Sequence, residues 1–573
     1  MRRLRGAGRA LVACAVVALV AVAASGGAGA ARGNDQLQKI NHIVVIYEEN
    51  HSFDNLYGGW EGVNGLANAD AAHTTQVDQN GNPYSCLQQN DVNLAPLGCN
   101  AFANTWWTID SYFPPTDTTC PTILNAFNFP FGVPRGTGLP GGCTRDLVHK
   151  FYQEQYQLNG GRQNRYATGS DSAGMSMGVY DTKALPVYRY LHEGGHPHYA
   201  IADNFFQAAF GGSFLNHQWL ISARTPVVPG AAQDGSSADR HSVLDANGMV
   251  QTRGFNATWN LFTYPLYVSP SPGTIRDREW TQKCNPPAVV VACGDYAVNT
   301  SQPVYRPFGA FGAKLPPQTT PTIGSRLSDG GIDWAWYAGG WDNAAGVTNG
   351  PGWTNGPGPT CSDPNVDPSA GIAVYPYCPS NIFQYHHQPF NYWKAFDPNT
   401  PEGAANRAAH LLDEQDFINA GNASGSSCQL KPVSFVKPFG LENEHPGYAS
   451  TTGSDSHLVQ LLKMIEGSAC AKDTMVIVTY DEFGGQWDHV PPPGQGNNNG
   501  PHDEWGPGTR IPALIVSPFL RGNFAVDHTE YDTTSILATI EQRYGLQPLA
   551  SRDAAVNSLS DVFAAKQYEA AGN

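Results

Sequence analysis

The sequence predicts an α/β fold built on a mainly parallel central sheet. Short apolar runs of strand length recur along the chain, and segments with helical character lie between them. Two of these runs are followed directly by acidic and amide residues, at the position where open α/β sheets bind their ligands. With 41% apolar residues, the chain of 573 residues has ample material for a core.

The elements follow from these runs in chain order. We expect strands at 43–47, 198–206, 433–436, 475–479 and 511–516, where apolar and β-branched residues dominate. Helices are expected at 153–158, 186–191, 457–466 and 533–544. Residues 223–379 are rich in Gly, Pro, Asn and aromatic residues without a helical period. We therefore expect one domain over 31–573, with a loop-rich insertion at 223–379 that forms a rim or cap over the site.

The first 30 residues have the pattern of a secretory signal peptide. Four arginines precede an apolar run at 11–24, and Ala28-Gly29-Ala30 supplies a cleavage site. The run is too short for a membrane span. Its removal takes away four of 33 basic residues and none of the 49 acids, which leaves a formal charge of −20. A secreted or periplasmic protein is expected, with no nucleic acid partner and no transmembrane segment. The oligomeric state is not readable from the sequence.

The cysteines are consistent with export. Eleven are present, and one of them, Cys14, lies in the signal segment. The remaining ten favour disulfides between neighbours in the sequence, and no CxxC pair suggests structural zinc. Sequential pairing predicts the bridges 86–99, 120–143, 284–293, 361–378 and 428–470, although the spacing does not prove them.

The residues after two of the expected strands predict a metal site. Glu49 and Asn50 follow the first strand, and Asp481 and Glu482 follow the strand at 475–479. Adjacent parallel strands would bring these side chains together at one edge of the sheet, and the Gly484-Gly485 pair permits close backbone approach. Oxygen donors of this kind favour one hard divalent ion, Ca²⁺, Mg²⁺ or Mn²⁺. Taken singly, such acids are as often caps of turns or helices.

Several segments resemble the signature blocks of the secreted phosphoesterase family, which joins bacterial non-specific phospholipases C to an acid phosphatase branch. The principal blocks are ENHSFD at 49–54 and TYDEFGGQWDHVPP at 479–492. Further blocks are MGVY at 177–180, EHPG at 444–447, and GPGTRIP at 506–512 leading into VSPF at 516–519. The resemblance extends from about residue 42 to 546 and is weakest across the inserted region.

The resemblance implies an alkaline-phosphatase-like three-layer α/β sandwich, in which a metal held by Glu49, Asn50, Asp481 and Glu482 lies beside a hydroxyl nucleophile. Ser213, in FGGSFLNH at 210–217, stands three residues before Asn216, as the nucleophilic Thr does in family phospholipases. Ser in place of Thr, Leu215 in place of Pro and His217 in place of Arg depart from the phospholipase pattern, and the serine resembles the acid phosphatase branch. By itself, Ser213 would be read as an ordinary turn serine.

Histidines in family blocks are the candidate groups for binding the phosphoryl oxygens and for protonating the leaving group. His386 and His387, in FQYHHQPF at 383–390, resemble a paired-histidine block of the acid phosphatase branch and are assigned to phosphoryl oxygens. His149 or His445 is expected to be the general acid, and His489 also lies in a family block. A second, histidine-held metal remains an alternative.

These observations predict an exported, metal-dependent phosphoric ester hydrolase of acid phosphatase type, acting through phosphoserine on a small phosphate ester, with an optimum below neutral pH. The first alternative is a phospholipase C that takes a phospholipid headgroup. A secreted protein that uses the metal only for structure is a distant alternative. A glycosidase is disfavoured, because the adjacent Asp481 and Glu482 project in different directions from extended backbone.

Overall fold

The computed structural model describes residues 33–89, 91–94, 102–121, 132–193, 197–231, 277–281, 292–309, 312–345, 383–496 and 498–569, with 255–256, 261–262 and 347. The expected signal peptide lies outside these residues. Within them, no helix has both the length and the apolar character needed to cross a bilayer.

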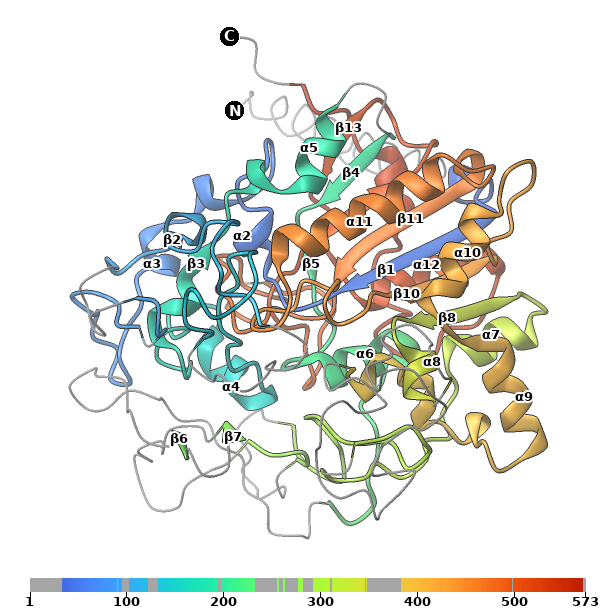
Figure 1. Cartoon of the computed structure of the whole chain (residues 1–573), viewed down its shortest axis with the longest axis horizontal. Coiled ribbons are helices and arrows are strands. Elements are labelled where there is room, and N and C mark those ends of the chain that lie inside the picture. Colours follow the sequence, from blue (N-terminus) through green and yellow to red (C-terminus); the bar gives the residue numbers. More distant parts are fainter. Residues whose placement is uncertain are drawn as a thin grey trace, which may run out of the picture.

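The core of the protein is an eight-stranded sheet that is parallel except at one strand (Figure 1). Only β12 runs antiparallel to its neighbours β11 and β4. In spatial order, the strands are β13 (Phe524–Asp527), β4 (Tyr199–Ala202), β12 (Ala513–Val516), β11 (Thr474–Tyr480), β1 (His42–Glu48), β10 (Val433–Lys437), β8 (Trp334–Ala338) and β9 (Leu411–Asp413). The predicted α/β fold with a mainly parallel sheet is confirmed.

The register of the central strands fixes the position of the residues that follow them. β1 pairs in parallel with β11, with Glu48 beside Tyr480, and pairs with β10 on its other side. Glu49 and Asp481 therefore leave the sheet side by side at its carboxyl edge. The prediction that these two strands are parallel neighbours is confirmed.

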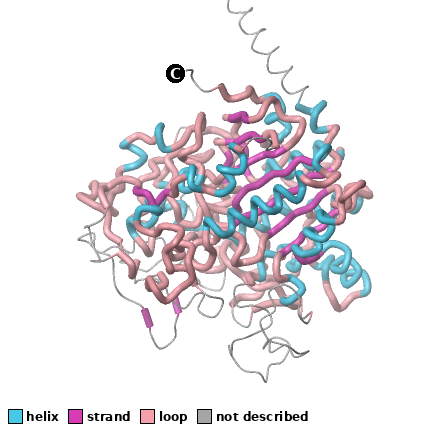
Figure 2. The backbone as a smooth tube through the Cα atoms, turned by 45° about the horizontal axis from the view of Figure 1, so that its top comes forward, coloured by secondary structure: helices cyan, strands magenta, loops and turns pink. Residues whose placement is uncertain are grey.

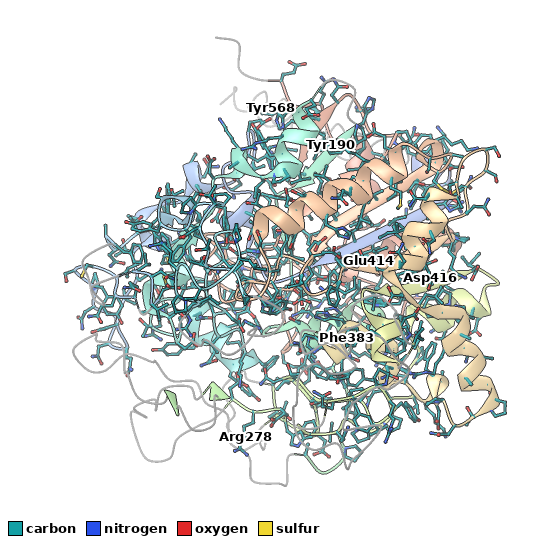
Figure 3. The ribbon with its side chains drawn as sticks, viewed as in Figure 1. Tyr190, Arg278, Phe383, Glu414, Asp416 and Tyr568 are labelled. Carbon is teal, nitrogen blue, oxygen red and sulfur yellow. A yellow bond between two sulfur atoms is a disulfide. The ribbon has the colours of Figure 1, made fainter. Side chains whose placement is uncertain are left out.

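Two groups of helices cover the sheet, which makes the three-layer sandwich. Helices α5 (Pro186–His192), α10 (Glu414–Asn422) and α11 (Thr451–Glu466) pack together, and α10 and α11 lie in front of the sheet in Figure 1. Helices α6 (Ser213–Ser222), α7 (Ile323–Asp329) and α12 (Thr534–Tyr544) form the second group. Figure 3 labels Glu414 and Asp416 at the start of α10.

Shorter elements and loops complete the fold, and loops make up much of the half of the molecule away from the sheet (Figure 2). Further α-helices among the described residues are α2 (Phe53–Leu56), α3 (Ala71–Thr74), α4 (Phe151–Leu158), α8 (Trp341–Ala344) and α9 (Pro401–His410), and residues 33–37 are also helical. The two-stranded pairs are β2 (Trp107–Thr108) with β3 (Gly178–Val179), β5 (Phe205–Phe206) with β14 (Tyr531–Asp532), and β6 (Phe255–Asn256) with β7 (Leu261–Phe262).

Several element boundaries differ from the expected ones. The run at 198–206 forms two strands, β4 and β5, separated by a turn at 203–204. Helix α11 begins at Thr451, six residues before the expected start, because Ser450 caps it by accepting a hydrogen bond from the Gly453 N–H. Within the expected loop-rich region, residues 323–345 contain α7, β8 and α8, and β8 is a strand of the main sheet.

Two of the expected disulfides are confirmed, Cys120–Cys143 and Cys428–Cys470. Cys86 and Cys293 are also disulfide-bonded. Each of the pairs 86–99, 284–293 and 361–378 includes a residue outside the described part of the chain.

Candidate active site

Three carboxylates and one amide converge where β1 and β11 end. Glu49, Asn50, Asp481 and Glu482 are all fully buried. The Asn50 backbone N–H donates to Asp481 Oδ1 at 3.2 Å, and Asn50 adopts a left-handed φ of 62°. Gly484 lies so close to Asn50 that a Cβ at this position would overlap the Asn50 carbonyl oxygen. The absence of a side chain at Gly484 therefore lets the loop after β11 approach the loop after β1, as expected of the glycine pair.

Ser213 lies against this cluster. Its Oγ is 3.1 Å from Glu49 Oε2, 3.3 Å from Asn50 Oδ1 and 3.5 Å from Glu482 Oε1. The sequence placed Ser213 on a glycine-rich turn, but it is the first residue of α6, with Gly212 as the N-cap. The unpaired N–H groups of a first helical turn favour negative charge, so this position suits a serine that carries a phosphoryl group.

Asn216 holds the turn that presents Ser213. Its Oδ1 accepts from the Ala209 N–H at 2.9 Å, and its Nδ2 donates to the carbonyls of Ala209 and Gly211. The spacing of three residues between serine and asparagine thus has a structural reason: the side chain reaches back across one helical turn.

The paired histidines lie on the same side as Glu49. His387 Nε2 is 2.7 Å from Glu49 Oε1, and its ring stacks on that of His217 with centroids 5.3 Å apart. The His386 ring lies 5.7 Å from that of His217. Burial lowers the pKa of all three histidines, which favours their neutral forms.

His149 and His445 form a second pair. His149 Nδ1 donates to the Leu147 carbonyl at 2.6 Å, which leaves Nε2 facing Asn50 Nδ2 at 3.5 Å and Glu482 Oε1 at 3.6 Å. The His445 ring is 5.9 Å from that of His149, and its Nδ1 donates to the Pro446 carbonyl. Burial lowers the pKa of both histidines.

Glycines from three distant loops hold the segment that carries His149. A Cβ added at any of four glycines would come within 2.6–2.9 Å of this segment, which requires the smallest residue at each point. The contacts are Gly447 with Asp146, Gly485 with Val148, Gly212 with His149 and Gly211 with Phe151. The position of His149 therefore depends on backbone packing from all three loops.

Lys437 is a site residue that the sequence analysis missed. It ends β10 and is fully buried, with Nζ 2.6 Å from Glu49 Oε1. The sequence contains a pattern that could have identified it, because Lys437 directly follows the apolar run at 433–436, as Glu49 and Asp481 follow their strands. His217, noted only as a departure from the phospholipase pattern, is also buried here, with Nδ1 2.8 Å from the Ser213 carbonyl oxygen.

The electrostatics of the cluster fit a divalent cation. Burial, then the nearby Glu49, raises the pKa of Asp481 well above its usual range, and burial and Asp481 do the same for Glu482. Burial would also raise the pKa of Glu49, but Lys437 and His387 reverse this and hold it well below its usual range. Asp481 Oδ2 has no hydrogen-bond partner among the described residues. Buried, crowded carboxylate oxygens of this kind are the donors that a hard cation prefers.

His489 belongs to a neighbouring network instead of the Ser213 cluster. Its Nδ1 lies 2.5 Å from Asp54 Oδ2, and its Nε2 is 3.3 Å from Asn64 Oδ1. Arg510 pairs with both Asp54 and Asp488 and is fully buried. These contacts tie α2, which follows the Glu49–Asn50 turn, to the loop after β11.

Comparisons with known proteins agree with this geometry. A model of the Phosphoesterase family matches residues 40–547. Phospholipase C A of Mycobacterium tuberculosis is 23% identical over 566 residues, which cover 94% of this chain and 79% of that protein. Phospholipase C B of the same organism is 21% identical over 568 residues, covering 94% and 80%. Non-specific phospholipase C6 of Arabidopsis thaliana is 29% identical over 146 residues, covering 22% and 28%.

A solved structure with local similarity is the PsFucS1 sulfatase from Pseudoalteromonas sp., at 14% identity over 26% of this chain and 32% of that chain. The TM-score of this match is 0.17.

The fold, the family match and the hydroxyl beside clustered oxygen donors define an enzyme class, the hydrolases that act on phosphoric ester bonds. The chain belongs to the Phosphoesterase family, whose model spans most of its length.

Proposed function

We propose that this protein is an exported, metal-dependent phosphatase of acid phosphatase type that acts through a phosphoserine at Ser213, with residues 31–573 as one catalytic domain. Residues 223–379 are proposed as a loop-rich rim only outside α7, β8 and α8, because β8 belongs to the central sheet. The observation that carries the proposal is the position of Ser213 Oγ, 3.1–3.5 Å from Glu49, Asn50 and Glu482. The substrate class is a small phosphate ester.

Glu49, Asn50, Asp481 and Glu482 would hold one divalent ion. When bound, the ion would supply positive charge beside the serine oxygen and the phosphoryl group. The serine needs such help, because a free hydroxyl is a weak nucleophile at neutral pH.

The reaction has two steps. Ser213 Oγ attacks phosphorus and its proton passes to water, a new Oγ–P bond forms, and the bond from phosphorus to the leaving oxygen breaks. The leaving oxygen takes a proton, for which His149 or His445 is the proposed donor. Water then attacks phosphorus, the Oγ–P bond breaks, a proton of the attacking water returns to Ser213 Oγ, and phosphate is released.

Charge on the phosphoryl oxygens is met by hydrogen-bond donors, and His386 and His387 are proposed for this role. His489 is proposed as a further catalytic residue, which would act from its position in the adjacent network with Asp54. The positive N-terminal end of α6, whose first residue is Ser213, would add to this stabilisation.

The test compares Ser213→Ala with the wild type on p-nitrophenyl phosphate after removal and restoration of divalent ions. We expect turnover to fall by about 10³-fold or more while metal binding persists. Ser222→Ala, at the other end of the same helix, is the matched control and should retain activity. Retained phosphatase turnover in Ser213→Ala would exclude the proposed nucleophile.

A phospholipase C is the second candidate, because the relatives that align with 94% of this chain are named phospholipases C. Parallel assays on p-nitrophenyl phosphate and phosphatidylcholine separate the two. We expect hydrolysis of the monoester with an optimum below neutral pH. Release of diacylglycerol from phosphatidylcholine alone would favour the second candidate, and activity that rises steadily into the alkaline range would argue against the acid type.

A further inference from the structure

Two nitrogen atoms converge on one oxygen of Glu49. Lys437 Nζ lies 2.6 Å from Glu49 Oε1, and His387 Nε2 lies 2.7 Å from the same atom. Lys437 is fixed in turn, because its Nζ donates to the Glu48 carbonyl at 3.1 Å and lies 5.4 Å from the centre of the Tyr47 ring. The ammonium group is therefore held by residues of β1 next to the site.

The other oxygen of Glu49 faces the opposite way. Oε2 is the atom 3.1 Å from Ser213 Oγ. Because two nitrogen atoms contact Oε1, Oε2 is the oxygen that Glu49 presents on the Ser213 side, and it would be the donor to a cation held there. The direction of the carboxylate plane is set by Lys437 and His387 together.

We infer that Lys437 is a positioning residue that acts through Glu49: it occupies Oε1 so that Oε2 alone is presented beside Ser213. The inference rests on the proposed function, because it concerns the same site. Residues that fix the direction of a ligating side chain have large effects on the reaction without touching the substrate.

A simpler role for Lys437 would be to neutralise the buried Glu49. The two roles make different predictions, because a divalent ion bound at Glu49 also neutralises it. If Lys437 were only a counter-charge, saturating metal would restore both stability and turnover after its removal. If Lys437 directs Glu49, saturating metal would restore stability and leave turnover low.

The experiment uses the full chain and Lys437→Met, which keeps an unbranched apolar stem and removes the charge. Lys431→Met is the matched control, because Lys431 stands just before the same strand and pairs with Asp333 at the surface. Three quantities are measured: the Kd for Mn²⁺ of the metal-free protein by calorimetry, the thermal midpoint with and without Mn²⁺, and kcat and KM for p-nitrophenyl phosphate at saturating Mn²⁺.

For Lys437→Met we expect a Kd within about threefold of the wild type, a thermal midpoint restored by Mn²⁺, a KM within about threefold and a kcat lowered at least about 30-fold. Lys431→Met should match the wild type in all three measurements. A kcat within threefold of the wild type at saturating Mn²⁺ overturns the inference.

A variant that does not fold even with Mn²⁺ also overturns the inference, if Lys437→Gln fails in the same way, because Lys437 is then needed for the fold itself. Wild-type protein without metal-dependent turnover would instead contradict the proposed function, so the two failures are distinguishable.

Discussion

Replacement of Gly485 by alanine tests whether close backbone packing positions His149, one of the two histidines proposed as general acid. Gly485 has a φ of +74°, and a Cβ at this position would lie 2.7 Å from the Val148 carbonyl oxygen and 2.9 Å from Leu147 Cβ. Val148 and Leu147 directly precede His149, and the Leu147 carbonyl accepts the His149 Nδ1 hydrogen bond. The new methyl group should therefore displace the histidine.

The expected loss of stability in Gly485→Ala has two contributions. A left-handed conformation costs a non-glycine residue about 1–2 kcal/mol. Overpacking against a backbone carbonyl, which cannot rotate away, adds about 1–3 kcal/mol. Gly485→Ala should lower the free energy of unfolding by about 2–5 kcal/mol. If His149 has the proposed role, turnover of p-nitrophenyl phosphate should fall about 10- to 100-fold, because small displacements of a catalytic group are costly.

Gly545→Ala is the matched control. Gly545 caps α12 with a φ of +66°, and a Cβ there would meet no atom within 4 Å. The free energy of unfolding of Gly545→Ala should fall by only about 1–2 kcal/mol, and its turnover should equal that of the wild type. The measurements are urea denaturation and steady-state kinetics. Equal losses of stability in the two variants, with unchanged turnover in Gly485→Ala, would refute the reasoning.

Three further predictions concern metal, pH and disulfides. Chelation should abolish turnover and lower the thermal midpoint of unfolding. Addition of Mn²⁺, Mg²⁺ or Ca²⁺ at 100 times its Kd should restore about 2.7 kcal/mol of stability in a thermal shift assay. Unchanged turnover after complete chelation would contradict metal dependence. Burial alone would lower the pKa of His457, but the Glu414 carboxylate at 2.8 Å raises it to about 9. The bound proton therefore stabilises the fold fully below about pH 6.5, and this stabilisation is lost as the pH rises through 9. His457→Gln should lower the free energy of unfolding by about 2–3 kcal/mol near pH 6 and by little above pH 10. An equal loss at both pH values in urea titrations would contradict this. Loss of Cys428–Cys470, which spans 42 residues, should cost about 4 kcal/mol by the loop-entropy relation, and a double serine variant with an unchanged unfolding midpoint would argue against it.

The strands that carry the site were predictable for a physical reason. A buried parallel strand is covered on both faces, so it appears in the sequence as a continuous apolar run, as in β1 and β11. The residue type changes abruptly where each strand leaves the sheet, which marked Glu49 and Asp481.

Other elements carried no such signal. Every residue of α6 is buried, so the helix has no solvent-exposed face, and its polar residues do not mark one side of it with a helical period. β8 reads WAWYA beside glycines and asparagines, and it lies within the region that the sequence predicts to be a loop-rich insertion. The antiparallel direction of β12 depends on the loop that leads into it, and the apolar pattern of a strand is the same in either direction.

Most of the chemical groups of the site can be recognised in the sequence: the oxygen donors after two strands, the serine three residues before Asn216, and the histidines in their blocks. Which of these groups meet depends on the folded chain, which brings Lys437 and His387 to one oxygen of Glu49 and places His489 beside Asp54. The reason is that strand order and loop packing set contacts between residues hundreds of positions apart, and no local pattern along the chain records them.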